Sequence, residues 1–126
     1  MNYFFFIQGR YADLDTYVPI ALEIKFKEKE SNISFIFFSG RDTEYYKKNK
    51  TLYKILKNNF HIYYLKSDQF YDWYKNKKKN FFNKFHYRLK IWVFLITKIL
   101  SSKRPILFKS RVYSEGIFIF LRLISK

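Results

Sequence analysis

The stretch from Tyr3 to Arg10, which reads YFFFIQGR, decides how the rest of this sequence is interpreted. It begins with an unbroken run of aromatic and aliphatic residues, which is typical of a strand buried on both faces of a parallel sheet. Gly9 then allows a sharp exit from the strand, and Arg10 places a permanent cation at that exit. We therefore expect a central parallel strand followed by a positively charged turn.

Two later stretches repeat this plan. The apolar run Ile33–Phe38 leads to Gly40 and Arg41, and the shorter run Ile106–Phe108 leads to Arg111. The carboxyl ends of parallel strands meet at one edge of their sheet, and ligands of open α/β sheets bind at that edge. The sequence therefore predicts an α/β domain that handles an anion.

A helix is expected between the first two strands. Asp15 or Thr16 is a suitable helix cap, Pro19 fits the first turn, and the helix should end near Glu30. Apolar residues recur at intervals of three and four, which predicts one buried face. The residues of that face are Leu14, Tyr17, Val18, Ala21, Leu22 and Phe26.

The middle of the chain predicts a second crossover. A polar helix should begin near Asp42, break near Asn49 and end at Asn59, before a third strand at Phe60–Leu65. His61 in that strand is either a general base or, as we favour, a structural residue, because no partner stands near it in sequence. Further on, Pro105–Phe108 predicts a fourth strand.

Together these elements predict the fold class α/β, a Rossmann-like parallel sheet of about four strands with helices on both faces. Residues 1–126 should form a single domain. The last apolar helix, Ile117–Ile124, has little left to bury it, so we expect this domain to be the amino-terminal half of a longer two-domain protein. The absence of cysteine and of an export leader at the start predicts a cytoplasmic location.

The chain is strongly basic, with a formal net charge of +15. Lys, Phe, Ile, Tyr and Asn supply 69 of 126 residues, and a genome rich in A and T would produce much of this composition in any protein. Position is therefore more informative than totals. Tyr71–Arg104 has ten Lys or Arg residues against one acid, interleaved with aromatic residues, and predicts one long helix or two joined ones.

This basic segment has two interpretations. Its aromatic face either enters the headgroup layer of an anionic membrane, with Lys77, Lys78, Lys79 and Trp92 at the membrane surface, or covers the sheet as an ordinary crossover helix. Single-stranded nucleic acid would be bound by similar residues, but the sequence has no pattern of a known RNA-binding or helix-turn-helix module.

The order of elements resembles the amino-terminal half of GT-B glycosyltransferases. Gly9, Pro19 ahead of an apolar IALEIK segment, and Gly40 stand where that family has a glycine turn, a helix-opening proline and a second strand closed by glycine. Residues 2–40 are also similar to the start of related CDP-glycerol-type polymer transferases. The chain departs from the family in having one glycine in the first turn and no histidine after it.

The resemblance implies the acceptor-side domain of a glycosyltransferase or glycerophosphotransferase of cell-surface polysaccharide assembly, inactive alone. A second domain would bind the nucleotide-activated donor, and Asp13 or Asp15 would replace the missing histidine as catalytic base. The acceptor could be lipid-linked, with the domain peripheral on the inner face of the membrane.

Phosphate groups suit the residues at the strand exits, because arginine pairs with phosphate oxygens through two hydrogen bonds and helix amino termini add free amides. The expected phosphate-binding residues are Gly9, Arg10, Gly40, Arg41, Ser110, Arg111, Ser114 and Glu115. The alternative is that the arginines form surface ion pairs with Asp13, Asp42 and Glu115.

No metal site and no cofactor are expected, because the two histidines are isolated. Two other classes of protein compete with the transferase. One is a non-enzymatic basic module that binds membrane surfaces or nucleic acid. The other is a flavodoxin-like or response-regulator-like domain, which is disfavoured because no acidic pocket closes the first strand.

Overall fold

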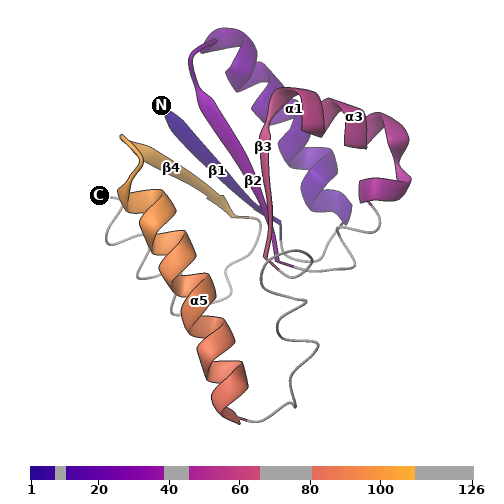
Figure 1. Cartoon of the computed structure of the whole chain (residues 1–126). Coiled ribbons are helices and arrows are strands. Elements are labelled where there is room, and N and C mark those ends of the chain that lie inside the picture. The colour runs from indigo at the N-terminus through magenta and orange to yellow at the C-terminus, as the bar shows by residue number, and fades with distance from the viewer. Residues whose placement is uncertain (8–10, 39–45, 66–80, 110–126) are drawn as a thin grey trace.

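The computed structural model describes residues 1–7, 11–38, 46–65 and 81–109, and four strands alternate with helices along them (Figure 1). The elements in chain order are β1 (Asn2–Ile7), α1 (Tyr11–Lys27), β2 (Asn32–Phe37), α3 (Lys50–Asn59), β3 (His61–Tyr64), α5 (Phe81–Leu100) and β4 (Pro105–Lys109). A short helical turn at residues 46–48 precedes α3.

The strands form one parallel sheet with the order β3-β2-β1-β4. β1 lies between β2 and β4, with Phe5 opposite Phe35 on one side and Phe108 on the other. The Phe5 ring stacks on both partners, at centroid distances of 5.0 Å and 4.5 Å. The prediction of an α/β fold with a central first strand in a parallel sheet is therefore confirmed.

Alternate residues of β1 belong to two separate cores, because successive side chains of a strand point to opposite faces of the sheet. Phe5 and its odd-numbered neighbours pack under α1 and α3, whereas Phe4 and Phe6 pack under α5. Of the described helices, Figure 1 shows α1 and α3 together on one face and α5 on the other. Helices therefore cover both faces, which explains why β1 has no polar side.

The predicted start of the first helix is wrong. α1 begins at Tyr11 instead of after Asp15 or Thr16, so Pro19 stands inside the helix, and α1 ends at Lys27 instead of near Glu30. Proline favours the first helical turn, but here Leu14 is buried on the sheet together with Val18, one turn later. Burial of the earlier turn outweighs the hydrogen bond that Pro19 cannot donate.

The predicted buried face of this helix is correct only in its first half. Leu14, Tyr17, Val18 and Ala21 are buried, whereas Leu22 is 37% exposed and Phe26 is 82% exposed. Ile24, which the prediction left out, packs against the core instead.

The other predicted elements agree with the structure where it describes them. The second helical segment breaks at Asn49, and the third and fourth strands lie within one residue of their predicted positions. The basic segment contains the 20-residue helix α5, while its residues 71–80 lie outside the described ranges. The predicted helix Ile117–Ile124 also lies outside them.

Candidate functional site

The carboxyl edge of the sheet, where its strands end, was predicted to hold the phosphate site. The structure makes β4 and β1 neighbours at this edge, with Lys109 opposite Phe6, and β2 reaches it on the other side of β1, with Phe37 opposite Ile7. The chain thus crosses from β3 over β2 and β1 to β4, which makes the β1–β4 boundary a topological switch point, where ligands of open α/β sheets bind. All eight residues predicted to bind phosphate lie outside the described ranges: Gly9, Arg10, Gly40, Arg41, Ser110, Arg111, Ser114 and Glu115.

The two candidate catalytic acids both lie in the first turns of α1 but differ in exposure. Asp13 is 6% exposed, whereas the side chain of Asp15 is exposed to solvent. Residues two apart on a helix do not face each other, so the two carboxylates cannot act together on one bond. Asp15 is the one that a substrate in solution can reach directly.

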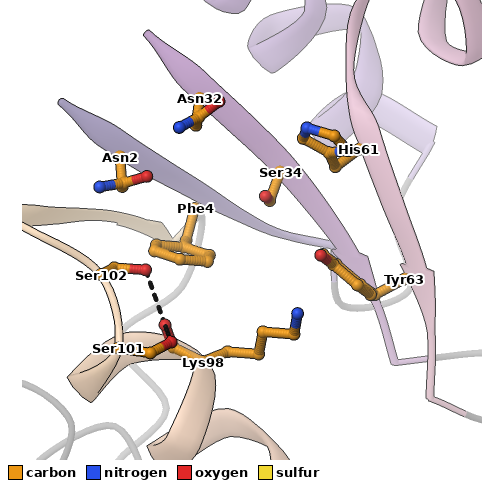
Figure 2. A pocket seen from close by; sticks show the side chains of 9 residues that line it. All are labelled: Asn2, Phe4, Asn32, Ser34, His61, Tyr63, Lys98, Ser101 and Ser102. Atoms are coloured by element: carbon orange, nitrogen blue, oxygen red, sulfur yellow. Dashed lines mark hydrogen bonds between the residues drawn. The ribbon is translucent and has the colours of Figure 1, made fainter.

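A second site, which the sequence analysis missed, lies at the opposite edge of the sheet, where its strands begin. This amino-edge pocket has a volume of about 240 Å³ and lies on the α5 face of the sheet (Figure 2). Strands β1, β2 and β3 supply one wall, and the end of α5 with the turn after it supplies the other. The lining residues are Asn2, Phe4, Asn32, Ser34, His61, Tyr63, Lys98, Ser101 and Ser102.

The register of the sheet explains why the polar residues of three strands meet here. Asn2 pairs with Asn32, and Ser34 pairs with His61, so all four lie near one end of the same face. Further along this face, Phe6 and Ile36 are buried under α5. The signal in the sequence was polar residues at the beginning of otherwise apolar strands, and it was informative only once the strand order was known.

Short contacts hold the wall formed by α5 and the following turn. The side-chain amide of Asn2 donates to the backbone carbonyl of Lys103 at 2.8 Å, which ties this turn to the start of β1. The hydroxyls of Ser101 and Ser102 donate to the carbonyl of Lys98 at 3.1 Å and 2.7 Å. The Lys98 amine lies 5.1 Å from the centre of the Tyr63 ring, within range of a cation–π interaction.

The outer side of α5 carries the remaining feature of functional interest. Six large apolar side chains of this helix are between 38% and 80% exposed, while Leu95 and Ile99 on the same helix are buried against the sheet. At 100° per residue the six fall within an arc of about 100°, which also contains the partly buried Ile96 and adjoins the buried Ile99. They form the outer stripe of α5: Phe82, Phe85, Leu89, Trp92, Val93 and Leu100.

Trp92, predicted to lie at a membrane surface, is therefore part of an exposed apolar stripe, whereas Lys77, Lys78 and Lys79 lie outside the described ranges. Among the described helices, none combines the length and apolar character needed to cross a bilayer. Within residues 1–7, 11–38, 46–65 and 81–109, no three acidic or histidine side chains gather where they could hold a metal ion.

Comparison with known proteins identifies no family for this chain. No protein-family model matches the chain, and no curated protein or solved structure matches it significantly.

Proposed function

We propose that this chain is the acceptor-side domain of a glycosyltransferase or glycerophosphotransferase that acts in cell-surface polysaccharide assembly. The observation that supports the proposal most is the strand order β3-β2-β1-β4 in a parallel sheet with helices on both faces. This arrangement has its switch point between β1 and β4, and the sequences after both strands contain an arginine.

In the proposed mechanism, Arg10, Arg41 and Arg111 pair with a pyrophosphate group of a lipid-linked acceptor and stabilise its charge. A carboxylate of α1 accepts a proton from the acceptor hydroxyl, and the exposed Asp15 is better placed for this role than the buried Asp13. The deprotonated acceptor oxygen then forms a bond to the transferred group of the donor, and the bond to the nucleotide breaks, so that the nucleotide leaves. Because a second domain binds the donor, the transfer requires both domains.

Calorimetric titration with inorganic pyrophosphate tests the arginine site. The triple variant Arg10→Gln, Arg41→Gln, Arg111→Gln should bind pyrophosphate at least about tenfold more weakly than the unaltered chain, because it loses charge-assisted hydrogen bonds. The matched control removes three exposed lysines of the second helical segment, Lys48→Gln, Lys50→Gln and Lys54→Gln, and should bind as the unaltered chain does.

Equal weakening in both triple variants would mean that only net charge matters and would refute the arginine site. Tighter binding of CDP than of pyrophosphate would contradict the acceptor-side assignment, since the donor nucleotide belongs to the other domain. The titrations need constant ionic strength, because screening changes every affinity of a basic protein.

We also propose a second function, docking on an anionic membrane surface through the outer stripe of α5. The six exposed side chains of the stripe include Phe82, Phe85 and Trp92, the aromatic types of interfacial helices. The sequence of α5 contains three lysines, one arginine and no acidic residue. An apolar stripe on a basic helix matches a surface of acyl chains below anionic headgroups.

Other occupants of the stripe fit less well. A second copy of the chain would also carry +15, so the two would repel each other. Nucleic acid would stack on the aromatic residues but would gain nothing from Leu89, Val93 and Leu100, which have no flat π-face.

Fluorescence of Trp92 tests membrane docking in a Trp73→Phe background. Vesicles of phosphatidylcholine with phosphatidylglycerol should shift the emission to the blue, and vesicles of phosphatidylcholine alone should shift it much less. The variant Phe85→Ser, Leu89→Ser should lose binding, whereas Phe26→Ser, which removes a still more exposed ring from α1, should retain it. Replacing Lys77, Lys78 and Lys79 with Gln should weaken binding by about 1 kcal/mol each, together roughly 100-fold.

Three outcomes would refute docking on lipid. The first is a shift with oligonucleotides but not with vesicles, and the second is equal binding by the Phe85→Ser, Leu89→Ser variant. The third is a Trp92 that acrylamide cannot quench in the free chain, since another segment of the chain would then already cover the stripe.

A further inference from the structure

We propose that the amino-edge pocket binds a small molecule through a phosphate group. This site lies at the opposite edge of the sheet from the proposed arginine site and is independent of it. Nine residues line the pocket; one is a lysine, one a histidine, and none is acidic. With about 240 Å³ it is smaller than the usual pocket for a drug-sized ligand, so a phosphate with a short carbon chain suits its size.

Lys98 is the main reason to expect an anion. Its side chain is only partly exposed, and its amine contacts the Tyr63 ring. Among the described residues no carboxylate forms an ion pair with it; the ion pair found there joins Lys27 to Glu23. The Lys98 ammonium group thus has no counter-charge among the described residues, and an anion bound in the pocket would supply one.

Ser34 gives a second, independent indication. Ser34 is 7% exposed in the interior of β2 and lines the pocket, so its hydroxyl is available to a ligand bound there. Figure 2 shows the hydroxyls of Ser34 and Tyr63 and the Lys98 amine around the same space. One ligand with several oxygen atoms can accept from all three.

The end of α5 needs separate consideration, because the carboxyl end of a helix carries partial negative charge and disfavours anions. Here the hydroxyls of Ser101 and Ser102 both donate to the carbonyl of Lys98, which satisfies one of the exposed acceptors of the last turn. The pocket therefore presents donors on the strand side and a partly neutralised helix end opposite. Phosphate, with more charge and more acceptor oxygens than a carboxylate, gains most from this set.

The test is proton NMR of the full chain, which has only two histidines, His61 and His86. A His86→Gln variant assigns the ring signals of His61, which lines the pocket. Inorganic phosphate, added at constant pH against sodium chloride of equal ionic strength, should shift the His61 signals saturably. The Arg10, Arg41 and Arg111 triple variant should show the same shift, which separates this site from the arginine site.

Variants of the pocket make the test specific. Lys98→Gln should weaken the affinity for phosphate, measured from the His61 shifts, at least about tenfold. Lys98→Arg should retain most of this affinity, and Ser34→Ala should weaken it severalfold. Lys54→Gln, an exposed lysine of α3 on the other face of the sheet, should change nothing. Circular dichroism and urea midpoints confirm that each variant is folded.

The proposal is overturned if phosphate shifts the His61 signals no more than chloride does, or if Lys98→Gln responds like the unaltered chain. An acetate titration with the same affinity as phosphate would also overturn it, because the pocket would then select any oxyanion and not phosphate.

Discussion

At the scale of single residues, buried polar groups without hydrogen-bond partners limit the stability of this small core. Tyr46 is fully buried among the rings of Phe37, Tyr53 and Tyr64, at centroid distances of 5.1–6.2 Å. Its hydroxyl is buried and forms no hydrogen bond of good geometry in the described part of the chain, although Tyr64 lies near enough to oppose the rise in its pKa. The ring therefore contributes packing, while its hydroxyl is a desolvated group that costs free energy.

We predict that Tyr46→Phe stabilises the fold at neutral pH by about 1 kcal/mol, since it removes this hydroxyl and keeps the ring. Urea unfolding followed by circular dichroism measures the change in the free energy of unfolding. Tyr46→Ala, which also removes the ring, should be strongly destabilising. A loss of stability in Tyr46→Phe would show that the hydroxyl has a partner.

Stability should also depend on pH through the buried tyrosines. Burial raises the pKa of Tyr46, and burial together with the hydrogen bond to Glu28 at 2.9 Å raises the pKa of Tyr3. The unfolded chain therefore releases these phenolic protons first, from about pH 10 upward, and the fold loses their contribution above that pH. Unfolding at a series of pH values should show a shallower alkaline loss in Tyr46→Phe than in the unaltered chain. Equal slopes would contradict the prediction.

At the scale of elements, local sequence determined α3 better than α1. Asn49 caps α3, with an extended backbone (φ −82°, ψ 91°) and a side-chain oxygen that accepts from the amide of Leu52 at 3.1 Å. This bond is local, so the helix break near Asn49 could be predicted from the residue type. The start of α1 depended instead on the burial of Leu14 against the sheet. The residues next to Leu14 in the sequence do not indicate this burial.

Asn49→Ala should destabilise the fold by about 1 kcal/mol, because an amide of the first turn of α3 loses its acceptor. The matched control is Asn58→Ala, an exposed residue in the last turn of the same helix, which should be neutral or slightly stabilising. Urea midpoints compare the two. Equal effects would mean that helix propensity, and not the cap, determines the contribution of Asn49.

At the scale of the whole molecule, β1 joins the two cores. Phe5 is fully buried and contacts the rings of Tyr17, Phe35 and Phe108, which come from α1, β2 and β4. Its ring therefore links segments that are up to 103 positions apart in the chain. Loss of this ring should affect every element at once.

Phe5→Ala should reduce the free energy of unfolding by about 3–5 kcal/mol through lost burial and the cavity left behind. Total stabilities of domains this size are about 5–15 kcal/mol, so much of the population could unfold. Phe26→Ala, at an 82% exposed ring of α1, should change stability by less than about 0.5 kcal/mol. Denaturant titration compares them, and a small loss in Phe5→Ala would contradict the central place of Phe5 in the core under α1 and α3.

The sequence by itself determined the class of the fold. Continuous apolar runs such as Tyr3–Ile7 and Phe35–Phe37 have no polar face, so they indicate a parallel sheet covered on both sides, and each run is local information. Turn and cap residues such as Asn49 are local in the same way. The sequence also predicted a phosphate site at the arginines after the strands, which stays a prediction.

Only the tertiary structure decided which strands are neighbours, which helices share a face and where a pocket opens. The amino-edge pocket joins Asn2, Ser34 and His61 to Lys98 and Ser102, and the outer stripe lies beside the buried residues Leu95 and Ile99, through which α5 packs on the sheet. Such groupings depend on contacts between residues far apart in the chain. Their physical cause is the packing of whole elements, which no short stretch of sequence encodes.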